Sequence, residues 1–175
     1  MQERKRIARF EQVVLPHLDA AYNLARWLTR SNHDAEDIVQ EAYMRAFRFI
    51  DGFRGGDSRS WLLAIVRNTC YTWLRQNRTH EFTTAFDEEV HSLDSDSHNP
   101  ETMLLQSVDN QLLRRALEEL PVESREVLIL HELEGLSYKE IAVIAGIPMG
   151  TVMSRLARAR GRLEQSLADR MKKEV

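Results

Sequence analysis

Segment 135–163 constrains the fold of this chain more than any other part of it. It reads GLSYKEIAVIAGIPMGTVMSRLARARGRL. Ser137 followed by Glu140 predicts a helix start, because the hydroxyl can accept from a first-turn amide while the carboxylate reaches back to the cap. Gly146 can take a positive φ and end that helix, and Pro148 is tolerated in the first turn of the next one. The segment therefore predicts two helices joined by a tight turn.

The second of these helices has an apolar and a basic face. Its buried stripe is predicted at Val152, Leu156, Ala159 and Leu163. Its polar face carries Thr151, Ser154, Arg155, Arg158 and Arg162. Four arginines and no carboxylates lie between Gly150 and Leu163, and guanidinium groups suit phosphate oxygens and guanine edges. The pattern is typical of a helix-turn-helix DNA reader; the alternative is a surface hairpin with a solvated basic face.

The rest of the chain is also helical in pattern. Apolar residues recur at three- and four-residue steps, and neither an alternating strand pattern nor an internal repeat is present. A first apolar stripe runs from Val14 to Leu28. A second helix is expected to be capped by Asp34. A third helix is expected over residues 61–77, after a glycine-containing loop over 52–60. After Pro121 a short helix is expected up to Leu133. The predicted fold class is all-α, with two small helical domains over residues 1–78 and 101–175.

An acidic segment separates these two domains. The net charge of the chain is −3, but residues 81–110 contain eight Asp and Glu and no Lys or Arg. We interpret residues 79–100 as an acidic flexible linker, extended and solvated by its own charge.

The compartment is indicated by two simple observations. Cys70 is the only cysteine, so an intramolecular disulfide is excluded and a reducing compartment is expected. The N-terminus has no apolar signal core, and the longest apolar run, Trp61 to Val66, is too short to span a membrane. We expect a cytoplasmic protein without membrane insertion.

Two groups of motifs support a family resemblance. The first comprises DAEDIVQE over 34–41, FRGGDS over 53–58, and the Arg67-Asn-Thr and Trp73-Leu-Arg triplets; the second comprises GLSYKEIA over 135–142 and GTVMSR over 150–155. In this order and spacing, over nearly the whole chain, they resemble regions 2 and 4 of a bacterial ECF-type (extracytoplasmic function) RNA polymerase sigma factor. The resemblance implies a subunit that binds core RNA polymerase, recognises promoter DNA and helps to open it.

The resemblance assigns the second helix to polymerase binding. Its candidate residues are Asp37, Gln40, Glu41 and Met44. They lie opposite the apolar positions of that helix, so an acidic and amide face with an exposed Met would meet a basic or mixed partner helix. Without the family pattern, an ordinary solvated helix face is the alternative.

The third helix and its preceding loop resemble the reader of the downstream −10 promoter element. Cations beside aromatic residues suit a single strand, and an exposed loop beside a polar helix can hold an unstacked base. Trp61 and Trp73 are expected in the core rather than as stacking platforms, because of their helical phase. The candidate residues for strand capture are Gly55, Asp57, Ser58, Arg67, Asn68, Tyr71 and Arg75.

The helix-turn-helix resembles the reader of the upstream −35 element in the major groove. Its candidate residues are Thr151, Ser154, Arg155, Arg158 and Arg160. Met153 stands where many relatives carry a basic residue and Ala157 where some carry an aromatic, so base-by-base readout does not transfer. About four phosphate contacts predict a log–log salt slope of roughly −3.6 for this domain.

The resemblance places the linker in polymerase channels, where its carboxylates would mimic nucleic acid; a plain tether is the alternative. The six histidines are dispersed, with His91 and His98 both in the acidic linker, and no paired-cysteine, phosphate-loop or nucleophile–base arrangement is present. We therefore predict no cofactor, no metal and no catalytic residue. Cys70 is expected to be buried rather than a redox switch.

Two other functions fit parts of the sequence. A sigma mimic that sequesters an anti-sigma factor would share the fold, but need not keep Arg155, Arg158 and Arg160. A helix-turn-helix repressor leaves segments 34–41 and 55–75 unexplained. We predict a sigma factor whose partners are core RNA polymerase, promoter DNA and an anti-sigma factor.

Overall fold

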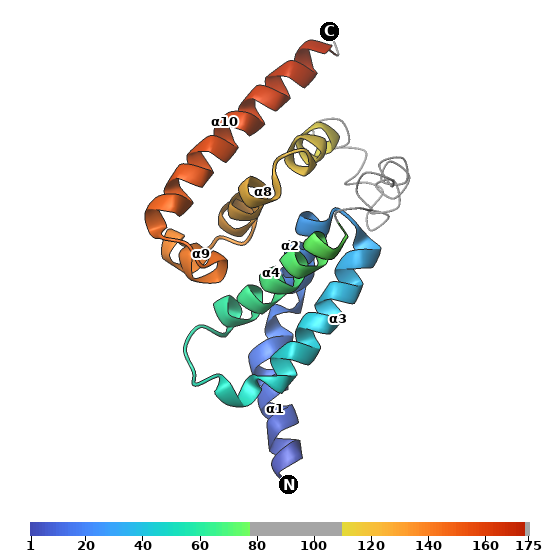
Figure 1. Cartoon of the computed structure of the whole chain (residues 1–175), viewed down its shortest axis with the longest axis vertical. Helices are drawn as coiled ribbons and strands as arrows, with labels where there is room; N and C mark the ends of the chain where they lie inside the picture. Colours follow the sequence, from blue (N-terminus) through green and yellow to red (C-terminus); the bar gives the residue numbers. More distant parts are fainter. Residues whose placement is uncertain (78–109, 174–175) are drawn as a thin grey trace.

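The computed structural model describes residues 1–77 and 110–173, and the predicted linker over 79–100 lies outside them. Both ranges fold into helices and no strand occurs within them, which confirms the all-α prediction. The N-terminal half contains α1 (Gln2–Val14), α2 (Leu18–Thr29), α3 (Asn32–Arg48) and α4 (Ser58–Gln76). The C-terminal half contains a helix over 110–118, α8 (Val122–Leu128), α9 (Tyr138–Ala145) and α10 (Met149–Lys173) (Figure 1).

The first apolar stripe belongs to two helices rather than one. A short 3-10 turn, η1 (Leu15–His17), separates α1 from α2, and Pro16 lies at its start. Proline removes a backbone donor and clashes with the preceding turn, so a continuous helix through residue 16 is disfavoured. Arg6 of α1 reaches across to the end of α3 and donates to the carbonyls of Phe47 and Arg48. It thereby satisfies helix-terminal acceptors that would otherwise need water.

The start of α3 differs from the sequence prediction. Ser31, not Asp34, is the N-cap: its hydroxyl accepts from the amide of Asp34 at 3.3 Å. Asp34 instead lies in the first turn, where its negative charge is favourable beside the helix N-terminus. Ser and Asp are comparably good caps, so the sequence alone did not decide whether the helix is capped at residue 31 or at residue 34.

The end of α8 passes into a π-helical turn, η3 (Ile129–Leu133). The amide of Glu134 donates to the carbonyl of Ile129, and the wider turn ends before Gly135, which has φ +67°. The predicted short helix is therefore present, but its last turn is wider than an α-turn. Side chains after such a turn are rotated relative to a regular helix, and Glu134 from this turn faces the N-terminal half.

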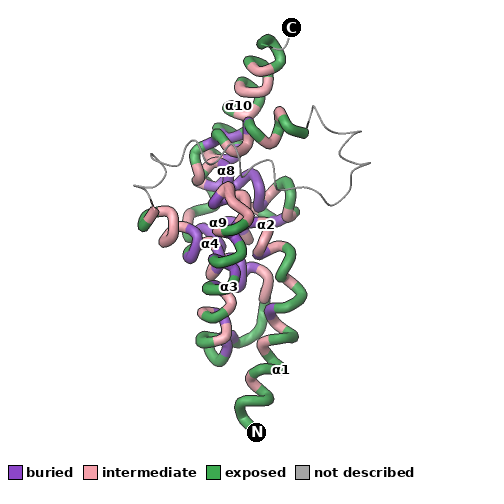
Figure 2. The backbone as a smooth tube through the Cα atoms, turned by 90° about the vertical axis from the view of Figure 1, so that its right-hand side faces the viewer, coloured by how far each residue is buried: buried purple, intermediate pink, exposed green. Residues whose placement is uncertain are grey.

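The two halves share one hydrophobic cluster. It includes Leu24, Leu28 and Val66 from the N-terminal half and Val127 and Leu130 from the C-terminal half. Figure 2 shows the buried positions concentrated in the middle of the molecule, while the outer ends of α1 and α10 are exposed. The sequence predicted two domains but not this contact between them.

Polar contacts reinforce the packing between the halves. Glu134 accepts from Asn23 at 2.8 Å and from Arg59 at 2.9 Å. Arg125 is 3% exposed and donates to the carbonyl of Leu28 in α2 at 3.1 Å. Buried polar groups are stable only when paired, so these contacts fix how the halves meet. No single helix in the described ranges has both the length and the apolar composition of a membrane span.

Candidate nucleic-acid interface

The turn between α9 and α10 has the predicted geometry. Ser137 accepts from the amide of Glu140 at 3.1 Å, and the Glu140 carboxylate accepts from the amide of Ser137 at 3.1 Å. Gly146 ends α9 with φ +68° and ψ +37°, a left-handed conformation that favours glycine. Pro148 comes just before α10 rather than within it, and its carbonyl accepts from Thr151.

The predicted DNA-reading face of α10 points away from the core. Val152, Leu156 and Ala159 are buried, as expected from the stripe. Ser154 and Arg158 are exposed, and Thr151 and Arg155 are partly exposed. The dipole at the N-terminus of α10 also favours phosphate.

Arg160 differs from Arg155 and Arg158 because its guanidinium forms an ion pair with a carboxylate. Its guanidinium lies 2.7 Å from the carboxylate of Glu132 in η3, and both side chains are about half exposed. The hydrogen bond from Arg160 lowers the pKa of Glu132. A phosphate would have to compete with this carboxylate, so Arg160 is not equivalent to Arg155 and Arg158.

The loop before α4 places its candidate residues in structural roles. Asp57 is the N-cap of α4 and accepts from the amide and the hydroxyl of Ser60. The Ser60 hydroxyl lowers the pKa of Asp57. Ser58 Oγ lies 2.9 Å from Nε2 of His17. Gly55 is exposed with φ +95°, so the loop turns where a side chain would be strained.

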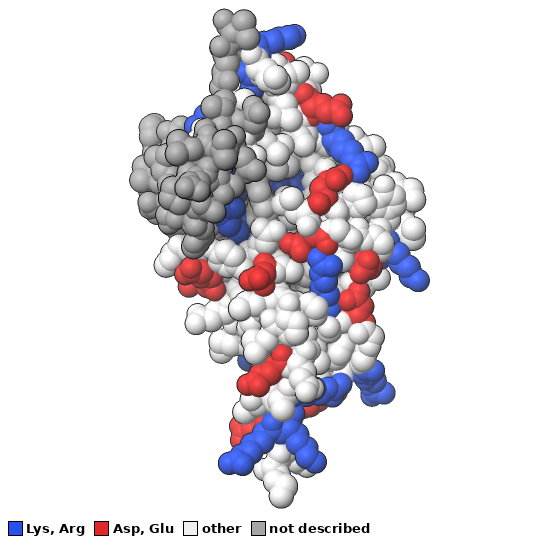
Figure 3. All heavy atoms as spheres, turned by 180° about the vertical axis from the view of Figure 1, so that it is seen from behind, with Lys and Arg blue, Asp and Glu red and all other residues white. Residues whose placement is uncertain are grey.

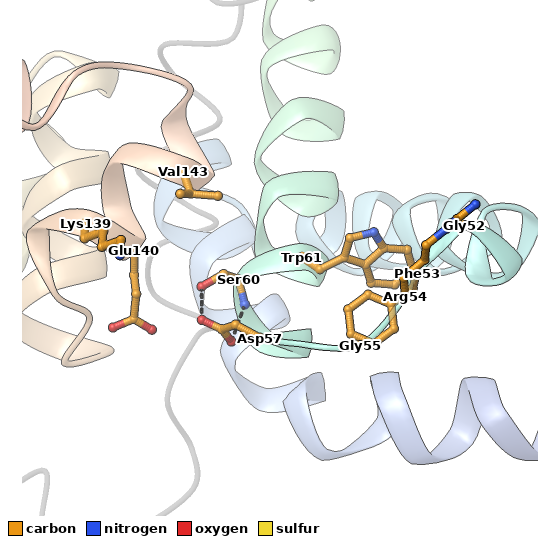
Figure 4. A pocket seen from close by; sticks show the side chains of 10 residues that line it. All are labelled: Gly52, Phe53, Arg54, Gly55, Asp57, Ser60, Trp61, Lys139, Glu140 and Val143. Atoms are coloured by element: carbon orange, nitrogen blue, oxygen red, sulfur yellow. Dashed lines mark hydrogen bonds between the residues drawn. The ribbon is translucent and has the colours of Figure 1, made fainter.

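A cleft of about 490 Å³ opens beside this loop (Figure 4). Its lining residues come from the loop and the start of α4 on one side and from α9 on the other: Gly52, Phe53, Arg54, Gly55, Asp57, Ser60, Trp61, Lys139, Glu140 and Val143. The cleft therefore exists only while the two halves are packed together.

The candidates further along α4 divide into two groups. Asn68 and Arg75 are exposed. Arg67 and Tyr71, in contrast, face the C-terminal half, where Nε of Arg67 lies 2.5 Å from Oε1 of Glu126 and the Tyr71 hydroxyl donates to Oε2 at 2.8 Å. The sequence predicted one continuous basic and aromatic side of this helix; half of that side is covered.

The electrostatics of this contact follow from burial. Burial lowers the pKa of Arg67, but the hydrogen bond and charge of Glu126 outweigh it and the net shift is upward. Burial, and then the charge of Glu126, raise the pKa of Tyr71. The Arg67 guanidinium also lies 4.0 Å from the centre of the Tyr71 ring. Arg67 and Tyr71 thus both stay protonated, and both donate to the carboxylate of Glu126.

The predicted polymerase-binding residues lie together on one exposed face of α3. Asp37, Gln40, Glu41 and Met44 are all exposed, and Met44 is 67% exposed. Glu41 pairs with Arg45 one turn further on at 2.7 Å, whereas Asp37 is 3.9 Å from His33. On the back of the molecule acidic and basic side chains alternate rather than separate (Figure 3). The α3 face itself carries charges of both signs, since Arg45 lies beside Glu41, and it suits a partner of mixed charge.

The alternatives left open for Cys70 and the tryptophans are partly resolved. Cys70 is fully buried on α4, and burial raises the pKa of its thiol to about 12. Trp61 and Trp73 are partly buried and pack against the core, and Trp61 lies 5.0 Å from the Phe53 ring, centre to centre. Within residues 1–77 and 110–173 no three His, Cys, Asp or Glu side chains are grouped as metal ligands would be. His91 and His98 lie outside the described residues.

The sequence matches two parts of one family. Sigma-70 region 2 matches residues 13–80, and Sigma-70 region 4 matches residues 110–163. The chain is 35% identical over 159 residues to the ECF RNA polymerase sigma factor SigE of Mycolicibacterium smegmatis, with 91% of this chain and 62% of that protein covered. It is 37% identical over 141 residues to the ECF RNA polymerase sigma-E factor of Escherichia coli, with 77% of this chain and 74% of that protein covered.

Solved structures agree with these matches. The fold resembles the sigma factor RpoE of Bartonella quintana in its complex with the anti-sigma factor NepR, with a TM-score of 0.70, 32% identity, and 91% of this chain and 96% of that chain covered. It also resembles CnrH in its complex with the cytosolic domain of CnrY, with a TM-score of 0.63, 26% identity, and 91% and 88% covered. A helical region 2 joined to a helical region 4 defines the sigma-70 class of transcription initiation factors. Within that class, the chain belongs to the ECF family of RNA polymerase sigma factors.

Proposed function

We propose that this chain binds core RNA polymerase in the cytoplasm and directs transcription from promoters that it recognises at both the −10 and the −35 element. Residues 1–78 would bind polymerase and the −10 element, and residues 101–175 would bind the −35 element. Residues 79–100 would connect these two domains. The observation that carries this proposal is the presence of both Sigma-70 regions on one chain, each with exposed candidate side chains on its own helix.

The −35 element would be read by α10. Arg155 and Arg158 follow the turn at Gly146 and face outward, at spacing suited to phosphate and base contacts in a major groove. The −10 element would be read by α4 and its loop, where Asn68 and Arg75 are exposed and Gly55 leaves space near the cleft. A single strand would be held there by cations and by the loop.

An anti-sigma factor is the remaining proposed partner. The relatives of similar fold, RpoE of Bartonella quintana and CnrH, are each seen in a complex, the former with an anti-sigma factor. Sigma factors are regulatory subunits, and we propose no catalytic residue, cofactor or metal for this chain.

The proposal is tested by run-off transcription with purified core polymerase on the promoter of the gene's own operon. The chain should convert core enzyme to initiation at one start site. Replacing both Arg155 and Arg158 by Ala should abolish most of this activity, whereas Arg115→Ala, which removes an exposed arginine from the helix over 110–118, should not. Binding to core without initiation on any candidate promoter would favour the sigma mimic.

A further inference from the structure

The contact between α8 and α4 centres on one buried carboxylate. Glu126 is 0% exposed, although glutamate is among the residues least often buried. Both of its oxygens are occupied, one by Arg67 at 2.5 Å and the other by Tyr71 at 2.8 Å. A buried carboxylate is tolerated only when it is paired and hydrogen-bonded, and here both partners come from the other half of the chain.

The partners of Glu126 are themselves proposed to bind DNA. A carboxylate on a guanidinium and a hydroxyl presents the same acceptor oxygens that a phosphate of a DNA strand would present. The Arg67 side chain is 18% exposed and its stacked partner Tyr71 is partly buried, so α8 covers the surface that a strand would need. Strand binding by these two residues and closure on Glu126 therefore exclude each other.

We propose that Glu126 acts as an internal substitute for the −10 strand and holds the free protein closed, so that Arg67 and Tyr71 become available only when α8 leaves α4. This inference rests on the proposed assignment of Arg67 and Tyr71 to the −10 element. The closed state is a conformational cost on strand binding, because the apparent affinity falls by the fraction of molecules that are open.

A second contact supports the same closure from a different part of the interface. Glu134 of the C-terminal half accepts from Arg59, next to the predicted −10 loop, and from Asn23 of α2. Its side chain is 11% exposed, and its main-chain carbonyl accepts from Arg59 as well, at 2.5 Å. Two carboxylates from the C-terminal half thus bind two arginines of α4. Both the start of α4, next to the loop, and the middle of α4 are therefore held against the C-terminal half.

The test compares Glu126→Gln with a matched control on the same helix. Glu126→Gln removes the buried charge and converts one of the two acceptors into a donor, so that Arg67 and Tyr71 can no longer both donate to this side chain. Glu123→Gln makes the same change of charge at an exposed position of α8. The free full-length proteins are compared by small-angle X-ray scattering and by binding to a short, fluorescein-labelled, single-stranded DNA of random sequence.

Glu126→Gln should increase the radius of gyration and tighten single-strand binding by about tenfold, while Glu123→Gln should change neither; a tenfold gain corresponds to opening that is easier by about 1.4 kcal/mol. A scattering profile and strand affinity equal to those of the native protein would overturn the proposal. Expansion without tighter strand binding would support closure by Glu126 and count against the −10 assignment of Arg67 and Tyr71.

A second variant tests the proposal independently, in case Glu126→Gln does not fold. Tyr71→Phe keeps the ring and its packing but removes the hydroxyl that donates to Glu126. It should also expand the free protein, though less than Glu126→Gln, while circular dichroism shows unchanged helix content. A Tyr71→Phe protein as compact as the native one would overturn the latch role of this carboxylate.

Discussion

Arg160 of α10 and Glu132 of the π-helical turn η3 form an ion pair across 2.7 Å. Because both side chains are exposed, the pair adds little to stability. Its effect should fall on DNA binding, since the carboxylate competes with phosphate for the same guanidinium.

Glu132→Gln should therefore strengthen binding to duplex DNA. One more available phosphate contact is expected to steepen the log–log salt slope by about 0.9. Fluorescence anisotropy of a labelled duplex over a series of salt concentrations measures this slope. Glu164→Gln removes an exposed carboxylate further along α10 and is the control. Equal steepening in both variants would show that net charge, not release of Arg160, is responsible.

The exposed face of α3 predicts an effect on polymerase binding. Asp37→Lys reverses a charge at the centre of this face and should weaken binding to core polymerase by roughly tenfold. Glu36→Lys reverses the charge of the neighbouring exposed residue, which points in a different direction around the helix. Competition with labelled native protein for core polymerase compares the two. A weaker effect of Asp37→Lys than of Glu36→Lys would contradict the predicted face.

Gly146 and Gly150 should respond oppositely to alanine. Neither has an atom within contact distance of an added Cβ, so only backbone conformation separates them. Gly146 has φ +68°, and Gly146→Ala should lower the free energy of unfolding by about 1 kcal/mol. Gly150 lies within α10, where Gly150→Ala should raise it by up to about 1 kcal/mol. Urea unfolding at neutral pH distinguishes them; destabilisation of equal size would show that the turn geometry is not the cause.

Stability should fall at alkaline pH because of Cys70. Burial raises the pKa of its thiol from 9.0 to about 12, so the folded protein keeps a proton that the unfolded chain releases. The contribution is complete below pH 9 and is lost between pH 9 and about 12, at up to roughly 1.4 kcal/mol per pH unit. Urea unfolding at pH 8 and pH 10.5 measures the loss. Cys70→Ala should lose less over the same interval, and an identical loss would assign it to other groups, among them Tyr43, whose pKa burial also raises to about 12.

The helix-turn-helix was predictable in detail because its signals are local. The capping box at Ser137 and Glu140 and the left-handed Gly146 depend on a few adjacent residues, and each has the predicted geometry. The start of α3 was less determined, because Ser31 and Asp34 are both competent caps and only the flanking backbone distinguishes them.

The contact between the halves left no local signal in the sequence. Glu126 lies in a short helix among apolar residues, and its spacing to Val127 or Leu130 does not show that its partners lie on α4, more than fifty residues earlier. Arg67 and Tyr71 were predicted to lie on an open binding side. Helical phase shows on which side of α4 a residue lies, but it does not show whether another helix covers that side. The candidate residues for DNA and polymerase stay predictions.

The hydrophobic cluster that runs through both halves also bears on how such a chain can be re-engineered. To change promoter preference, one would exchange the C-terminal half for that of a relative, on the assumption that it is an independent domain. Here a graft without an acidic residue at position 126 would leave Arg67 and Tyr71 without their shared acceptor, and one without apolar residues at 127 and 130 would leave the hydrophobic cluster that includes Leu28 and Val66 incomplete. Chimeras should therefore be less soluble, or should lose the closed state of the free protein, unless the facing residues of both halves are exchanged together.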